Sequence, residues 1–180
     1  MIIIDSRERQ FKHITDYFDV HGISYKTEKL ETGDYQNTDN PSVLVDRKAD
    51  LEEVNNNLSK GKSKHSRFVR ECKRAFDNKQ RLIVLIEGTN YRSVEEIKTW
   101  ESKYSTHTGR WLANEMFKLT MAFGVEWQFC RKNVTPQRIL EITGYDKGRD
   151  QTKFINARVD VSIWDQRQEQ YVQVSVSWRR

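Results

Sequence analysis

Two short segments that carry carboxylates lie on either side of a turn-forming segment in the first third of the chain. The first is Gly33-Asp34-Tyr35, and the second is Val45-Asp46-Arg47-Lys48. The segment between them, Asn37-Thr38-Asp39-Asn40-Pro41, consists of residues that favour turns, so the flanking segments can pair as an antiparallel hairpin. Such a hairpin would bring the carboxylates of Asp34 and Asp46 close to each other.

The second strand of this hairpin would present different residues on its two faces. Side chains alternate along a strand, so Asp46 and Lys48 project from one face, while Val45 and Arg47 project from the other. Two carboxylates can bind a hard divalent cation such as Mg2+ together with phosphate oxygens, and a neighbouring lysine can stabilise developing negative charge. The pattern therefore predicts metal-dependent hydrolysis of a phosphodiester.

An ion pair on an exposed strand is the alternative interpretation, because Asp-x-Lys arises often by chance. A second acidic pair favours the metal site. Asp5 and Glu8 follow the apolar run Met1-Ile2-Ile3-Ile4, and α/β proteins usually build their sites at the carboxyl ends of strands. We expect all four acids to lie near one another.

The order and spacing of these motifs resemble those of the XPF-type structure-specific endonucleases, a branch of the PD-(D/E)xK nuclease superfamily. The family's Asp-x-Arg-Glu element reads Asp5-Ser6-Arg7-Glu8 here, and its Gly-Asp-Tyr element is found at residues 33–35. Its Val-Glu-Arg-Lys signature reads Val45-Asp46-Arg47-Lys48. The family's Gly-Arg-Phe/Leu element is similar to Ser66-Arg67-Phe68, and its following apolar strand resembles residues 82–87. The resemblance covers roughly residues 1–144.

The resemblance implies a role for each matching residue. The implied metal ligands are Asp5, Glu8, Asp34 and Asp46, and the implied catalytic set is Glu8, Asp34, Asp46, Arg47 and Lys48. It also implies Mg2+ or Mn2+ as cofactor, branched, flapped or junction DNA as substrate, and a homodimer or heterodimer. The chain departs from the family pattern at two points: Asp46 replaces the usual glutamate, and the downstream acid is displaced, which leaves Asp50 and Glu52 as candidates.

The pattern of elements predicts an α/β fold in which helices flank a central mixed β-sheet. It is the restriction-endonuclease-like nuclease core that the resemblance implies. We expect strands at residues 1–5, 23–30, 82–86 and 125–130, a β-hairpin at residues 33–48, and helices at residues 9–20, 51–58, 67–78, 110–123 and 135–143. Residues 1–144 would form the nuclease domain. Residues 145–180 would form a C-terminal β-hairpin that packs on the core or extends its sheet.

Composition sets independent bounds on the class of protein. The chain has 180 residues, a net charge of +5 and a sequence pI of about 9.2, which favour a polyanionic partner. It has no apolar run long enough for a membrane span and no secretory leader at its start, so we expect an intracellular protein without a membrane partner. Cys72 and Cys130 are too far apart for a zinc site, and we expect two buried thiols.

Basic residues near the predicted site are candidate contacts to the DNA backbone. They are Arg7, Lys60, Lys62, Lys64, Arg67 and Arg70. A solvated helix face is the alternative for the helical part of this run, since charge runs often have no further role. Two other functions stay open at this point: a catalytically silent nuclease-fold subunit that only binds DNA, and a protein-interaction module that uses the terminal hairpin.

Overall fold

A six-stranded mixed sheet forms the centre of the N-terminal part of the protein. The computed structural model describes residues 1–59, 67–145, 159–165 and 170–176. The strands are β1 (Ile2–Asp5), β2 (Tyr25–Glu28), β3 (Tyr35–Asn37), β4 (Asn40–Lys48), β5 (Arg81–Ile86) and β6 (Glu126–Phe129). Their order across the sheet is β2-β1-β3-β4-β5-β6. Only β3 runs antiparallel to its two neighbours, and the other adjacent pairs are parallel.

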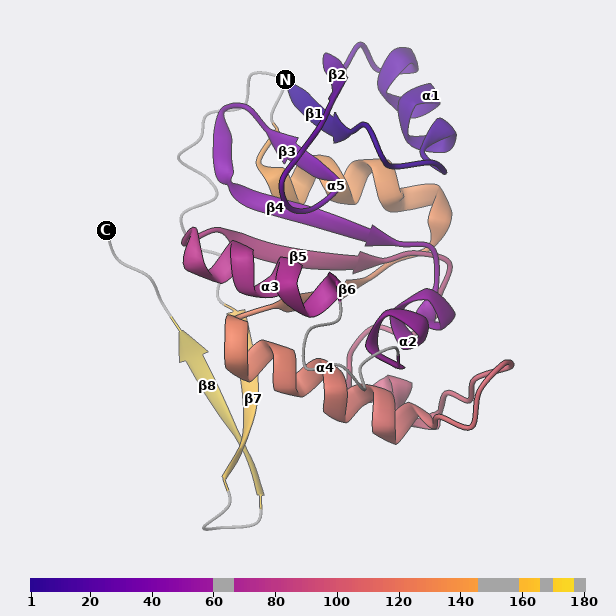
Figure 1. Cartoon of the computed structure of the whole chain (residues 1–180), viewed down its shortest axis with the longest axis vertical. Coiled ribbons are helices and arrows are strands. Elements are labelled where there is room, and N and C mark those ends of the chain that lie inside the picture. The colour runs from indigo at the N-terminus through magenta and orange to yellow at the C-terminus, as the bar shows by residue number, and fades with distance from the viewer. Residues whose placement is uncertain (60–66, 146–158, 166–169, 177–180) are drawn as a thin grey trace. The chain divides into compact units, whose positions relative to one another are not determined.

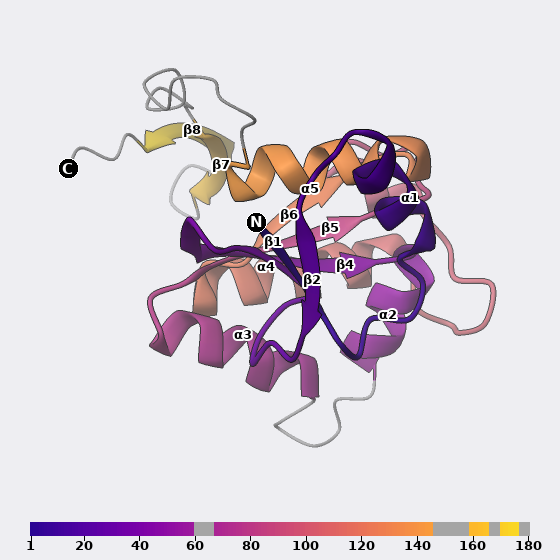
Figure 2. The ribbon, with the colours of Figure 1, turned by 90° about the horizontal axis from the view of Figure 1, so that it is seen from above.

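Helices cover both faces of this sheet, as the sequence predicts. Helices α1 (Lys12–Val20) and α5 (Thr135–Thr143) lie on one face, and α2 (Leu51–Ser59), α3 (Arg67–Asp77) and α4 (Gly109–Phe123) lie on the other (Figures 1 and 2). Two short 3-10 helices, η1 (Glu96–Thr99) and η2 (Lys132–Val134), precede α4 and α5. The predicted α/β class with a mixed central sheet is confirmed.

Strand β4 separates two apolar cores because its side chains alternate. Leu44 packs with residues of α2, α3 and α4, whereas Val45 packs with residues of α1 and α5. Strand β5 is buried on both faces, with Leu82, Val84 and Ile86 in the first core and Leu85 in the second. The same alternation continues to the end of β4, where polar residues replace apolar ones.

The predicted antiparallel pairing of β3 with β4 is present, with a shift of register between Gln36 and Asn37. Tyr35 pairs with Val45, and Gln36 pairs with Leu44. Gly33, just before β3, has φ +74°, and a Cβ atom there would lie 3.1 Å from the Val45 carbonyl oxygen. A glycine therefore suits both the backbone conformation and the close approach. It lets the Asp34 N–H donate to the Val45 carbonyl at 2.7 Å.

The first helix begins later than the sequence predicts. The pattern suggested a start near Arg9, but α1 begins at Lys12. The Glu8 carboxylate accepts hydrogen bonds from the backbone N–H groups of Arg9 and Gln10, both at 2.9 Å. These bonds hold residues 8–10 in a turn that delays the helix.

The C-terminal residues form a separate unit. The chain divides into Met1–Tyr145 and Asp146–Arg180. In the second unit, β7 (Val159–Asp165) and β8 (Gln170–Val176) pair antiparallel, with Val159 opposite Val176, so the predicted hairpin is present. Its expected packing on the core stays a prediction. Within the described part of the chain, no helix has the length and apolar character needed to cross a membrane.

Candidate active site

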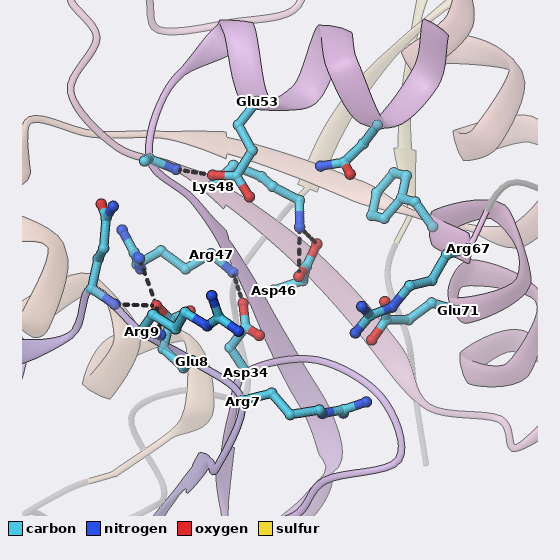
Figure 3. Close-up of a pocket in the computed structure, with 14 residues that line it drawn as sticks. Arg7, Glu8, Arg9, Asp34, Asp46, Arg47, Lys48, Glu53, Arg67 and Glu71 are labelled. Carbon is cyan, nitrogen blue, oxygen red and sulfur yellow. Dashed lines mark hydrogen bonds and ion pairs between the residues drawn. The ribbon is translucent and has the colours of Figure 1, made fainter. Parts of the chain in front are cut away.

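A cavity of about 400 Å³ opens at the carboxyl end of β4, on the face covered by α2 and α3. Its walls come from four parts of the chain: residues 7–10 after β1, Asp34 before β3, the end of β4, and helices α2 and α3 (Figure 3). Most of the lining side chains are charged. The centre of the cavity is formed by Asp34, Asp46 and Lys48.

The hairpin brings Asp34, Asp46 and Lys48 together, as its pattern predicts. Asp34 precedes β3 and Asp46 lies on β4, so the two carboxylates come from adjacent strands. The Lys48 ammonium lies 2.8 Å from Asp46 Oδ1 and 2.7 Å from Asp46 Oδ2. The Arg47 backbone N–H donates to Asp34 Oδ2 at 2.8 Å, which fixes the orientation of that carboxylate.

The two carboxylates repel each other in a buried setting. Burial, followed by the charge of Asp46, raises the pKa of Asp34 well above its usual value, and the nearby Lys48 only partly opposes this effect. Burial alone would lower the pKa of Lys48, but the charges of Asp46 and Asp34 outweigh it and raise that pKa. Lys48 is therefore an ammonium group at neutral pH, which suits charge stabilisation rather than proton abstraction.

The donor set fits a divalent cation that keeps water or phosphate ligands. Asp46 is 3% exposed, and its Oδ2 atom is buried without a hydrogen bond of good geometry, although Lys48 lies near it. A buried carboxylate beside a second carboxylate is a natural ligand pair for Mg2+ or Mn2+. No group of three or more His, Cys, Asp or Glu side chains within the described residues could hold a metal alone. The remaining ligands would thus come from substrate and solvent.

The Arg47 side chain turns away from Asp46 and Lys48, as strand alternation predicts, although Arg47 is also among the residues that line the cavity. Its Nη2 atom donates to Glu8 Oε1 at 2.8 Å, and its Nη1 atom donates to Glu87 Oε1 at 2.5 Å. Glu8 lines the cavity, but its Oε1 atom also accepts the backbone N–H groups of Arg9 and Gln10. Glu8 therefore stands beside the carboxylate pair in a position fixed by Arg47.

Asp5 has a different setting from the other predicted ligands. It is 1% exposed, and its carboxylate accepts hydrogen bonds from the backbone and side chain of Arg7 and from the Leu30 N–H. Burial opposes the ionisation of Asp5, but the bonds from Arg7 dominate in sum and lower its pKa. Both oxygens are thus occupied by protein donors, and Asp5 is not among the residues that line the cavity. We therefore leave Asp5 out of the proposed ligand set.

Two glutamates in the cavity were not predicted from the sequence. Glu53 of α2 and Glu71 of α3 line it, whereas the candidates Asp50 and Glu52 do not. Asp50 accepts the Glu53 N–H at the start of α2, and Glu52 binds Ser102. Burial, followed by the charge of Asp46, raises the pKa of Glu71. The packing of α2 and α3 brings these acids to the site, and no local sequence motif identifies them.

The predicted DNA contacts fall into three groups. Arg67 lines the cavity from α3, and Arg70 is exposed on the same helix. Arg7 also lines the cavity, but its guanidinium binds Asp5 and the Leu30 carbonyl. Arg9, which the sequence did not single out, lines the wall opposite Arg67 (Figure 3). The other predicted contacts, Lys60, Lys62 and Lys64, lie outside the described residues.

Comparisons with known proteins bear on the family and the fold of this chain. Residues 4–141 match the family model of the ERCC4 domain. The fold is similar to XPF from Aeropyrum pernix, with a TM-score of 0.61 and 19% identity over 82% of this chain and 65% of that chain. It is also similar to XPF from Aeropyrum pernix in complex with DNA, with a TM-score of 0.57 and 20% identity over 79% of this chain and 62% of that chain. The chain thus spans less than two thirds of the length of these structures. No curated protein matches.

Proposed function

Because this chain belongs to the ERCC4 domain family, we propose that it is a divalent-metal-dependent endonuclease that hydrolyses DNA phosphodiesters at branched, flapped or junction structures. The observation that carries the proposal is the pair of Asp34, half-buried, and Asp46, buried, with Lys48 beside it. This arrangement is costly for the fold unless a cation joins the two carboxylates.

Each residue of the site has a distinct part in the proposed reaction. Asp34 and Asp46 would hold the cation, Mg2+ or Mn2+, which supplies Lewis-acid polarisation of the phosphate and a lower pKa for an attacking water. Lys48, fixed by Asp46 at 2.8 Å, would stabilise the negative charge that develops on the phosphate oxygens. Glu8 borders the carboxylate pair and would orient the attacking water.

The walls of the cavity suit a phosphate backbone. Arg9 and Arg67 approach the acids from opposite sides, and within the described residues neither side chain forms an ion pair (Figure 3). Guanidinium groups bind phosphates well, and such contacts position a backbone without reading its bases. This is why we propose that the shape of the DNA determines where the protein binds. One of the similar structures is a complex with DNA, which supports the same partner.

Cleavage of a labelled flap or junction DNA with Mg2+ or Mn2+ tests the proposal. We expect Asp34→Asn and Lys48→Ala to lower the cleavage rate by about 100-fold or more, because each removes a group that acts on the reacting phosphate. Asp34→Asn keeps the shape of the side chain, so the effect does not depend on a variant that fails to fold.

An exposed Asp–Lys pair provides matched controls for this experiment. Lys73 and Asp77 form an ion pair on α3, with side chains 61% and 52% exposed. Lys73→Ala and Asp77→Asn should cleave as the wild type does. Equal cleavage by wild type and both site variants, or none by the folded wild type with either metal on any of these DNAs, would refute the proposed function.

A further inference from the structure

Glu87 is a buried acid that no motif of the site includes. It follows β5 directly, is 1% exposed and does not line the cavity. Its Oε1 atom accepts from Arg47 Nη1 at 2.5 Å. Its Oε2 atom accepts from Thr135 Oγ1 at 2.8 Å and lies 3.0 Å from His13 Nε2. One carboxylate thus joins β4 to the first residue of α5 and to α1.

The charges around Arg47 indicate what this carboxylate does. A single guanidinium lies between two buried carboxylates, Glu8 and Glu87, with contacts to its two terminal nitrogens. Glu8 alone would suffice to neutralise the guanidinium. The second carboxylate fixes its direction, because two contacts at opposite ends hold a planar fork in one orientation. The third nitrogen, Nε, is buried without a hydrogen-bond partner, so it adds no such restraint.

The orientation of the Arg47 guanidinium matters to the cavity because it holds the Glu8 carboxylate at the cavity wall, at 2.8 Å. The Arg47 backbone N–H also donates to the Asp34 carboxylate at 2.8 Å, but the pairing of β4 with β5 sets its place. A shift of the guanidinium would therefore reach Glu8, the acid beside the carboxylate pair.

We infer that Glu87 is a positioning residue for the site: it holds the Arg47 guanidinium, and through that guanidinium it holds the Glu8 carboxylate in place. Its own position is set by His13 and Thr135, so helices α1 and α5 brace the cavity from the far face of the sheet. This inference rests on the proposed nuclease function. It assigns a part in that function to residues that touch neither DNA nor metal.

The test compares Glu87→Gln with a matched substitution elsewhere. Glu126→Gln also removes the acid of an Arg–Glu ion pair. Its partner is Arg81, and the pair lies at the opposite end of β5 and β6 from Glu87. We expect Glu87→Gln to lower the single-turnover cleavage rate by about 10- to 100-fold, the usual effect of losing a residue that orients a ligand, with an unchanged KM for DNA. Glu126→Gln should cleave at the wild-type rate.

A double-substitution cycle separates positioning from general stability. Arg47→Lys keeps the positive charge but replaces the planar guanidinium, so the lysine cannot bind the Glu8 and Glu87 carboxylates with two separate nitrogens. If Glu87 acts through Arg47, Glu87→Gln should cost less than twofold in an Arg47→Lys background. Should Glu87→Gln fail to fold, His13→Gln loosens the same carboxylate and is expected to lower the rate a few-fold, again without effect beside Arg47→Lys.

Two results would overturn the inference. One is a Glu87→Gln rate within twofold of wild type, and the other is a loss that multiplies fully with that of Arg47→Lys. A crystal structure of Glu87→Gln gives a readout independent of activity, since Arg47 and Glu8 should leave their present positions. If that structure shows both side chains unmoved, the inference fails even where wild-type cleavage is normal. Absence of cleavage by wild type would instead count against the proposed function.

Discussion

Asp34 is the residue at which burial and the proposed chemistry oppose each other most directly. It lies half-buried beside Asp46, and burial followed by this neighbouring charge raises its pKa. Its ionised form is therefore destabilising in the folded protein, although that is the form that would bind a cation. Lys48 supplies the largest compensating charge.

Removing the Asp34 charge should accordingly stabilise the protein when no metal is present. We expect Asp34→Asn to raise the free energy of unfolding by about 1 kcal/mol at neutral pH in EDTA, within the range of typical stabilising changes. The raised pKa means that the folded state binds the proton more tightly than the unfolded chain. The advantage of Asp34→Asn should thus be full above the folded-state pKa and disappear as the pH falls toward the unfolded value near 4.

Urea unfolding of both proteins between pH 4 and pH 8 measures this difference. The exposed Asp77→Asn should change stability by less than about 0.5 kcal/mol at any pH in this range. A less stable Asp34→Asn at neutral pH would show that the buried charge is not the source of strain. Added Mn2+ should reverse the order, because it stabilises only the protein that binds it.

At the scale of elements, the β3–β4 hairpin accounts for most of what could be predicted. Turn residues 37–41 and strand alternation place Asp34 and Asp46 on adjacent strands, with Lys48 beside them, from local information alone. Glu71 could not be predicted in this way, because the packing of α3 on the sheet brings it there. Glu87 did carry a signal, an acid directly after a buried strand, but its partners on α1 and α5 are set by tertiary contacts.

The hairpin also gives a prediction about backbone geometry. Gly33 and Gly124 both have positive φ, but a Cβ at Gly33 would lie 3.1 Å from the Val45 carbonyl oxygen, while one at Gly124 would meet nothing within 4 Å. Gly124→Ala should cost about 1 kcal/mol of stability from backbone strain alone. Gly33→Ala should cost about 2–3 kcal/mol, because strain and crowding add.

Cleavage assays extend this comparison to function. Gly33 directly precedes Asp34, so a change in its backbone conformation would move that carboxylate. We therefore expect Gly33→Ala to slow cleavage and Gly124→Ala to leave it unchanged. Thermal denaturation supplies the stabilities. Equal losses of stability in the two variants would mean that the close approach to Val45 has no energetic weight.

At the scale of the whole molecule, the proposed DNA must bind a protein that is positively charged overall but has an acidic cavity. The net charge is +5, yet the cavity centre is anionic, so binding depends on the basic residues at its walls. Each phosphate that a basic side chain neutralises adds about 0.9 to the slope of log affinity against log salt. We expect Arg9→Gln and Arg67→Gln each to weaken binding of a metal-free flap DNA and to lower this slope by about one.

A basic residue next to the amino end of β5, away from the cavity, provides the control. Lys79 is exposed just before β5, at the end of the strand away from the cavity. Lys79→Gln makes the same change in net charge and should leave the slope nearly intact. A uniform decrease in all three variants would instead indicate that only total charge matters, and that the cavity walls do not hold the backbone. Fluorescence anisotropy over a range of salt concentrations measures all of these affinities.

The alternation along β4 also limits how the length of the chain can vary. Inserting or deleting one residue between Val43 and Asp46 would turn Asp46 and Lys48 toward the apolar core under α1 and α5, and would place Arg47 on the face that Asp46 and Lys48 now occupy. Such a change would remove both the chemistry and its support in one step. The turn at Thr38 and Asp39, which lies outside the strands, can absorb extra residues without this exchange. Tags, reporters or recognition loops can therefore be inserted in that turn, where they leave the alternation of side chains along β4 unchanged.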